Sequence, residues 1–278
     1  MPPPLLRTIV KRVDDLPGLT GLCAGFEGGE WRYEQLAEHI VEWLPEFALN
    51  EREFNALSGA NARRALRAAA ETIYKSAKYA TRGEIGEILL HAIIRQEFGS
   101  TPAISKVFFK DAPNDTVKGF DAVHVVEAND GLELWLGEVK LYQDVSSAVR
   151  DVVKELHEHT RIPYLRTEFA AIWRKVDPDH PHRAALERLL AGNVTMDEVF
   201  TRLSIPVLLT YDSSTVAAHK RTDGVYEAAI AAEFDKHHGR FRAARLPDEV
   251  KIILILLPMN NKAKLIERFD AKLKGMMA

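Results

Sequence analysis

Apolar and polar residues alternate along residues 132–141, and this period of two predicts a β-strand. The leucines at positions 132, 134 and 136 alternate with Glu133, Trp135 and Gly137. Continuing the alternation puts Glu138 and Lys140 on the face that carries the leucines. Charged groups on a buried face need partners, because an isolated buried charge is costly. Two interpretations stay open: the two side chains pair with each other, or Glu138 binds a metal ion.

Alternating helices and strands are predicted along the rest of the chain, as in an α/β fold. A helix is expected over residues 82–98, because its apolar positions are followed by Gly99 and Pro102. Further strands are expected over 105–110, 120–126, 205–211 and 250–257, and further helices over 144–159, 222–238 and 262–274, with a charged helical insertion before residue 205. The turn sequence Asn129-Asp130-Gly131 predicts that strands 120–126 and 132–141 form a hairpin.

Residues 1–78 are predicted to form a mostly helical N-terminal region. Apolar side chains occur at helical spacing over residues 31–44, which Pro45 ends, and residues 55–80 are rich in alanine. No catalytic motif lies in this region. We therefore expect residues 1–78 to dock on a partner and residues 79–278 to form a second domain.

Asp121 lies inside the predicted strand 120–126, upstream of Glu138. Neighbouring strands are about 5 Å apart, so a hairpin brings Asp121 beside Glu138 and Lys140. Two carboxylates that share a hard cation are ligands that Mg²⁺ accepts, with positions left for water and phosphate. The hairpin therefore predicts a magnesium site.

The predicted helix over residues 82–98 is apolar around most of its circumference and has a single polar stripe of Glu84, Glu87, His91 and Arg95. A helix this apolar is largely buried. Taken alone, the stripe fits solvent exposure equally well. Beside the predicted hairpin it favours a role in the same site.

The Glu-x-Lys spacing also occurs at Glu249 and Lys251, which serve as a comparison. That copy opens a predicted strand, follows Pro247 and Asp248, and has no upstream strand with an aspartate. We expect these side chains to flank the beginning of a strand and to have no catalytic role.

Several motifs resemble the PD-(D/E)xK nuclease superfamily. They are K-G-F-D-A-V at 118–123, with Phe120 in place of the family's proline, L-W-L-G-E-V-K-L-Y at 134–142, and R-G-E-I-G-E-I-L-L-H at 82–91. With L-P-E-F-A-L at 44–49 and I-Y-K-S-A-K-Y at 73–79, the chain resembles more narrowly the HamA nuclease family of Hachiman anti-phage defence systems. The likeness runs from about Trp31 to the C-terminus and is strongest over 79–160. It implies a restriction-endonuclease-like αβββαβ core with a helical N-terminal region and helical insertions.

The resemblance also implies roles for individual residues. Asp121, Glu138 and Lys140 correspond to the family's catalytic positions, and the helix glutamate corresponds to Glu87 or Glu84, with Glu87 favoured. Asp121, Glu138, the Val139 carbonyl and Glu87 would hold one or two Mg²⁺ or Mn²⁺ ions. Lys140 would orient or activate water, and Glu84 or His91 would support the metal ligands.

The implied activity is metal-dependent hydrolysis of DNA phosphodiester bonds. The chain would be the effector subunit of a Hachiman-type complex, with a helicase partner of the HamB type. The alternative is an inactive subunit that keeps the nuclease fold and binds DNA or the helicase. The complete set of Asp121, Glu138 and Lys140 argues against that alternative.

Composition limits how DNA could be bound. The 37 Lys and Arg residues against 40 Asp and Glu give a net charge of −3, so attraction to nucleic acid must be local or a partner must deliver the substrate. The densest basic run contains Lys236, Arg240, Arg242 and Arg245 around His237-His238. A solvated helix end is the default interpretation of this run, and a phosphate-binding patch is the alternative. Tyr142 and Gln143 follow the predicted catalytic strand and are candidates to touch substrate.

Other classes of function are disfavoured by what the sequence lacks. One cysteine, Cys23, excludes an intrachain disulfide and a cysteine-rich zinc site. We expect a cytoplasmic protein with no membrane contact, since no apolar run reaches about 18 residues and no secretory signal is present. Without a P-loop motif, ATP-driven movement would come from the partner. The histidine pairs 157/159 and 180/182 are expected at the surface, because residues two apart point away from each other on a helix.

Overall fold

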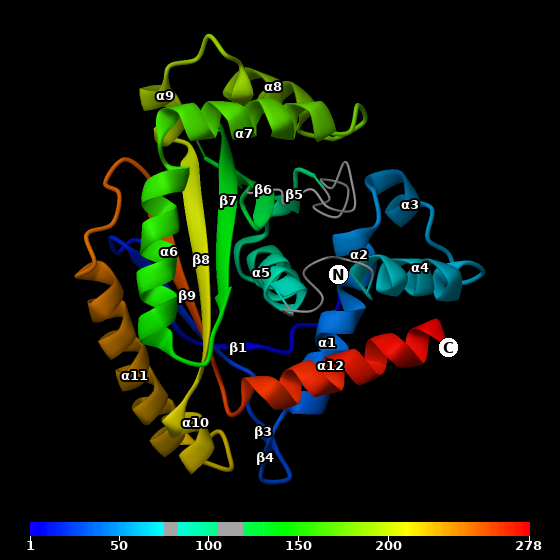
Figure 1. Cartoon of the computed structure of the whole chain (residues 1–278), viewed down its shortest axis with the longest axis vertical. Helices are drawn as coiled ribbons and strands as arrows, with labels where there is room; N and C mark the ends of the chain where they lie inside the picture. Colours follow the sequence, from blue (N-terminus) through cyan, green and yellow to red (C-terminus); the bar gives the residue numbers. More distant parts are fainter. Residues whose placement is uncertain (75–82, 105–118, 130) are drawn as a thin grey trace.

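The computed structural model describes residues 1–74, 83–104, 119–129 and 131–278. Within these residues, seven strands form one sheet that lies between two layers of helices (Figure 1). Across the sheet the strands are β1 (Arg7–Arg12), β2 (Gly18–Cys23), β9 (Lys251–Met259), β8 (Leu203–Asp212), β7 (Gly131–Leu141), β6 (Ala122–Ala128) and β5 (Thr101–Pro102). The four strands from β2 to β7 are parallel, and β1, β6 and β5 pair antiparallel. A separate hairpin contains β3 (Phe26–Glu27) and β4 (Glu30–Trp31).

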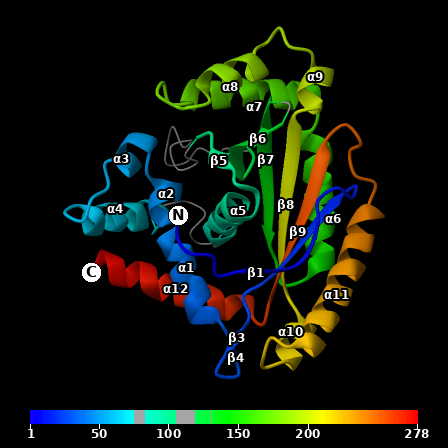
Figure 2. The same cartoon turned by 180° about the vertical axis from the view of Figure 1, so that it is seen from behind.

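Helices cover both faces of the sheet, and the central strands are correspondingly apolar. In β8 and β9 almost every residue is buried, which fits strands that are covered on both faces. On one face α6 (Val145–His159) covers β7 and β8, and α11 (Gly224–Arg242) covers β1 and β2. On the other face α5 (Gly83–Phe98) packs on β6, β7 and β8, beside α1 (Tyr33–Glu42) and α12 (Lys262–Met277) (Figure 2).

Shorter helices complete the two layers. The chain leaves α1 through α2 (Leu44–Ala48), α3 (Glu51–Asn55) and α4 (Ala62–Tyr74), and α4 packs against α2 and α12. The insertion between α6 and β8 contains α7 (Ile162–Lys175), α8 (Arg183–Leu190) and α9 (Met196–Phe200), while α10 (Ser214–Ala218) follows β8. The charged helical insertion expected before residue 205 is therefore confirmed.

The mixed α/β fold is as predicted, and so is the succession of α5, β6, β7 and α6. β6 and β7 form the expected antiparallel hairpin, and α6, β8, α11, β9 and α12 follow in the expected order. The strand expected over 105–110 lies outside the described residues, although β5 comes just before it and pairs with β6. The nuclease-type αβββαβ core stays a prediction. The second Glu-x-Lys copy lies, as expected, at the beginning of β9, with Glu249 and Lys251 exposed.

The mostly helical interpretation of residues 1–78 is wrong for the first 31 of them. β1 and β2 belong to the main sheet, and β2 lies between β1 and β9. β2 is a six-residue apolar segment, and periodicity alone cannot distinguish so short a segment from a helix. Pro45 lies in the first turn of α2, so the helix expected over 31–44 is followed directly by another. The division at residue 78 stays a prediction, and strands from both sides of it share one sheet.

Two glycines allow α5 to approach β7 closely. A Cβ atom on Gly86 of α5 would lie 2.9 Å from Val139 Cγ2, and one on Gly137 of β7 would lie 2.7 Å from Leu90 Cδ2. The face of β7 with Gly137 and Val139 is therefore the one that packs on α5. Since successive side chains alternate, Glu138 and Lys140 lie on the opposite face, which α6 covers.

Candidate active site

Asp121 is fixed beside Glu138 by backbone pairing. Ala122 lies opposite Gly137 in the ladder, so the preceding Asp121 lies next to Glu138 on the same face. The backbone N–H of Asp121 donates to the Gly137 carbonyl at 2.7 Å, and the Val139 backbone N–H donates to Asp121 Oδ2 at 3.0 Å. The predicted proximity of the two carboxylates is thus confirmed.

The two carboxylates and Lys140 line one cavity of about 320 Å³. Its lining is Gly119, Asp121, Glu138, Lys140, Glu155, Glu158, His159 and Tyr164, contributed by β7, the segment before β6, α6 and α7. We call this cavity the carboxylate pocket. Four of its side chains are acidic, so the pocket is suited to bind a cation, together with the water or phosphate that the cation coordinates.

Glu138 is buried and makes a short contact with a histidine. Its side chain is 2% exposed, and Oε1 lies 2.5 Å from His159 Nδ1. Burial, together with the charge of Asp121, raises the pKa of Glu138 to about 7, although the hydrogen bond of His159 lowers it. Burial also opposes ionisation of His159, but the hydrogen bond and charge of Glu138 raise the pKa of that histidine overall.

Lys140 forms an ion pair with Glu155 of α6. Burial favours the neutral amine, but the hydrogen bond and charge of Glu155, with the charges of Glu138 and Asp121, raise the pKa of Lys140. The lysine is therefore a fixed cation among carboxylates. Of the two interpretations left open by the sequence, the pairing of Glu138 with Lys140 is wrong, because each of them bonds to a residue of α6.

Glu84, Glu87 and His91 are not grouped with the carboxylate pocket. All three are buried, with 4%, 6% and 4% exposure, so the interpretation of a solvent-facing stripe is wrong. None of them lines the pocket, and α5 lies on the face of β7 opposite to Glu138. The position of a helix relative to the two faces of a sheet is set by long-range packing, and the spacing of polar residues within the helix does not report it.

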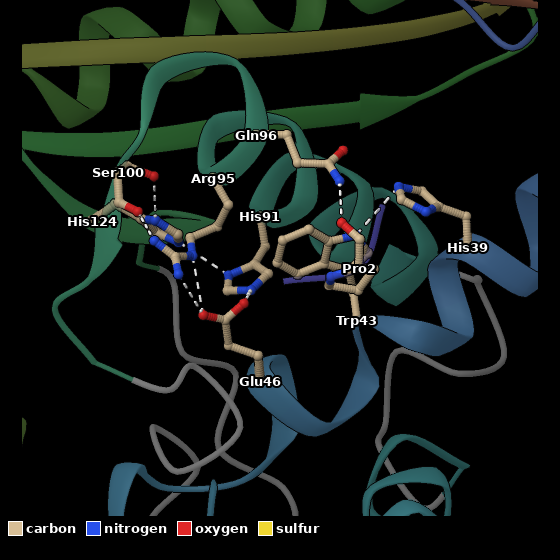
Figure 3. Close-up of polar contacts among 9 residues, drawn as sticks. All are labelled: Pro2, His39, Trp43, Glu46, His91, Arg95, Gln96, Ser100 and His124. Carbon is tan, nitrogen blue, oxygen red and sulfur yellow. Dashed lines mark hydrogen bonds and ion pairs between the residues drawn. The ribbon is translucent and has the colours of Figure 1, made fainter. Parts of the chain in front are cut away.

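His91 instead belongs to a buried polar network that joins α2, α5 and β6 (Figure 3). Glu46 accepts from Arg95 Nε at 3.0 Å and lies 3.4 Å from His91 Nε2. His91 Nδ1 lies 3.1 Å from His124 Nε2, and His124 Nδ1 lies 2.9 Å from Ser100 Oγ. Burial lowers the pKa of His91 and that of His124. Through these contacts the two histidines link the N-terminal helices to the sheet.

The candidate DNA-binding residues lie outside the pocket. Lys236, Arg240, Arg242 and Arg245 are all exposed, in the C-terminal half of α11 and just after it. Arg240 Nη1 donates to Ser146 Oγ of α6 at 2.5 Å, which brings this basic run alongside the helix that covers the pocket. Both histidines inside the run, 237 and 238, are buried, so only the basic side chains fit a solvated surface.

Tyr142 and Gln143 follow β7 but do not line the carboxylate pocket. The Tyr142 hydroxyl donates to Asp151 Oδ2 at 2.9 Å, and Gln143 Nε2 donates to Asp212 Oδ2 at 3.3 Å. The contact with substrate suggested for these two residues stays a prediction.

Sequence reasoning missed Glu155, His159 and Tyr164 as pocket residues. The prediction of a surface histidine holds for His157, which is exposed, but is wrong for His159, which is 9% exposed and stacks on Tyr164. It is also wrong for His180, which is 6% exposed. One signal was present: Glu155 and His159 are four residues apart, so they share a face of the helix that follows the catalytic strand.

The donor set fits a cation that takes few ligands from the protein. Among the described residues, no three His, Cys, Asp or Glu side chains are grouped to hold a metal ion. Asp121 and Glu138 nevertheless place two like charges together, and the raised pKa of Glu138 reflects that repulsion in part. A divalent cation relieves it, and Mg²⁺ commonly binds one or two carboxylates while water and phosphate complete its coordination.

Two comparisons with known proteins bear on this site. A family model described as HamA matches residues 5–273. Anti-bacteriophage protein A of Escherichia coli (strain K12) is 23% identical over 255 residues, which is 89% of this chain but 46% of that protein. The chain thus spans less than half the length of this curated relative.

In the described part of the chain, no helix has the length and apolar character needed to cross a membrane.

Proposed function

The chain belongs to the HamA family, and from that premise we propose that it is a metal-dependent DNA nuclease, the effector subunit of a Hachiman-type anti-phage defence complex. The observation that carries the proposal is the convergence of Asp121, Glu138 and Lys140 in one pocket. The name of the Escherichia coli relative supports the role in defence against phage. A helicase partner would move the DNA.

Asp121 and Glu138, with the Val139 carbonyl, would hold one or two Mg²⁺ or Mn²⁺ ions. When bound, the metal acidifies a water molecule and neutralises charge on the phosphate. The chain's own residues prepare the site: Val139 N–H holds Asp121, and Glu155 holds Lys140 in its protonated form. The Lys140 ammonium supplies a point charge for the phosphate in the transition state.

DNA would reach the pocket of a chain that is not basic overall. With a net charge of −3, the chain attracts nucleic acid only where basic side chains gather. The exposed residues Lys236, Arg240, Arg242 and Arg245 lie alongside α6, so we propose them as contacts to the phosphate backbone. Partner-driven loading would supply the rest of the affinity.

The test is cleavage of plasmid DNA by the complex with its helicase partner and ATP, with Mg²⁺ and with EDTA. We expect Mg²⁺-dependent cleavage that is lost in Glu138→Ala with Lys140→Ala. The matched control is Glu249→Ala with Lys251→Ala, which has the same spacing on exposed residues and should cleave normally. Cleavage that survives the Glu138 and Lys140 changes would defeat the proposal.

The alternative, an inactive subunit that keeps the fold, gives a different outcome. In that case neither the complex nor its variants cut DNA under any metal condition. A gel shift would then show DNA binding that Glu138→Ala and Lys140→Ala leave unchanged.

A further inference from the structure

Two side chains on one face of α6 contact two side chains on one face of β7. Glu155 and His159 are one helical turn apart, about 6 Å along the axis. Lys140 and Glu138 are two residues apart on β7, about 6.6 Å. Since the two elements run in opposite directions, Glu155 meets Lys140 and His159 meets Glu138. The contacts therefore follow from one register between helix and strand.

The His159 ring is held in place by aromatic neighbours. It stacks on Tyr164 with ring centres 4.4 Å apart and an interplanar angle of 14°, and Phe120 packs at 5.2 Å in an edge arrangement. The side chain is 11% exposed. With its ring confined from two sides, His159 presents Nδ1 to Glu138 in one orientation.

Each of the two carboxylates thus has one oxygen on a fixed N–H donor. Asp121 Oδ2 accepts from the Val139 backbone, and Glu138 Oε1 accepts from His159. A carboxylate that is bonded through one oxygen cannot rotate freely, so its orientation toward a cation is set before the cation binds. Partners of this kind around metal ligands commonly change metal affinity about 10–100-fold when removed.

We infer that His159 is a positioning residue that orients Glu138 for a divalent cation. The inference rests on the proposed function, because it concerns the same pocket. It assigns a role to a histidine whose neighbour on the same helix, His157, contacts the Arg245 carbonyl on the surface. His157 is therefore a matched control.

The experiment measures binding of Mn²⁺ alone to the full chain by isothermal titration calorimetry at pH 8, without DNA. We expect His159→Phe, which keeps a ring against Tyr164 but has no N–H, to weaken Mn²⁺ binding about 10–100-fold. His159→Asn, whose amide can replace Nδ1, should recover part of the affinity. His157→Phe should bind as the unaltered chain does. Thermal unfolding of each variant shows that it is folded, and Tyr164→Ala, which leaves Nδ1 in place without its stacking partner, should give an intermediate loss.

The outcomes separate the two proposals. If His159→Phe binds Mn²⁺ as tightly as the unaltered chain or more tightly, while Glu138→Gln abolishes binding, only the inference about His159 is overturned. If the unaltered chain shows no Mn²⁺ binding that depends on Glu138, the metal site of the proposed function fails and the inference fails with it.

Discussion

Asp121 and Glu138 show how a strand pair can hold two acids side by side, with the ionisation of Glu138 opposed by its surroundings. Burial and the Asp121 charge raise the pKa of Glu138 to about 7, above the value of about 4.5 in an unfolded chain. A group whose pKa is higher in the folded state contributes stability at low pH and loses that contribution as pH rises. Without a cation, the pocket is therefore destabilising above about pH 7.

We predict that Glu138→Gln stabilises the metal-free protein at pH 8 by about 1–3 kcal/mol, since each pKa unit corresponds to about 1.4 kcal/mol. The gain should shrink toward pH 5, where Glu138 is already protonated in the folded state. Urea unfolding in EDTA at both pH values measures the difference. A change of equal size at pH 5 and pH 8 would contradict this account of the pocket.

Helix α5 depends on glycine for its approach to β7. In a helix interior, Gly→Ala is normally stabilising by about 0.5–1 kcal/mol. A Cβ atom on Gly86 would lie 2.9 Å from the buried Val139 side chain, so we predict that Gly86→Ala is destabilising. A Cβ atom on Gly239 of α11 would meet none of the described residues within 4 Å, and Gly239→Ala should show the ordinary gain. Thermal unfolding of the two variants should give shifts of opposite sign.

The network around Glu46 connects α2 to α5 and β6. Burial opposes ionisation of Glu46, but the hydrogen bonds and charges of His91 and Arg95 lower its pKa overall. Removing that charge leaves Arg95 half-buried with a weaker partner, so we predict that Glu46→Gln costs about 1–3 kcal/mol. The exposed Glu34, paired with Lys272 at 2.7 Å, is the control, and Glu34→Gln should cost less than about 1 kcal/mol.

The histidines of the network add a dependence on pH. His91 and His124 have folded-state pKa values below 6.5, so their contribution to stability is present above about pH 6.5 and is lost as pH falls. Urea unfolding of the Glu46→Gln and Glu34→Gln variants at pH 7.5 and pH 5.5 tests this dependence on pH. An equal cost for Glu46→Gln and Glu34→Gln would show that the buried network adds nothing.

At the scale of the whole molecule, the N-terminal residues complete the sheet. β2 pairs with β9, and α1 packs against α12, so residues 18–42 cover both an edge and a face of the remaining chain. We predict that residues 79–278 alone do not fold stably, because the edge of β9 and its apolar surroundings become exposed. Circular dichroism and gel filtration of this fragment are the measurements. A monomeric fragment that unfolds cooperatively would contradict the prediction and support the division at residue 78.

This arrangement changes how partner docking is tested. Deleting residues 1–75 would disturb the sheet itself, so loss of binding to the proposed helicase partner would not report on docking alone. Substitutions of exposed residues on α3 and α4 leave β1 and β2 in place and test the same expectation.

The sequence alone determined which side chains of β7 share a face and that β6 and β7 are neighbours. The alternation of the leucines predicted that Glu138 and Lys140 point the same way, and the turn before Gly131 predicted the hairpin that brings Asp121 beside them. These are local properties, because the period of a strand and the length of a turn are fixed by a few adjacent residues.

Only the tertiary structure decided which helix covers that face. The polar stripe of α5 suggested that Glu84 and Glu87 join the site, yet α5 packs on the opposite side of β7 and α6 supplies Glu155 and His159 instead. It also decided that β2 belongs beside β9. Both faces of a central strand are apolar, so the side on which a helix packs depends on chain crossings and close contacts between distant residues, such as Gly86 and Val139.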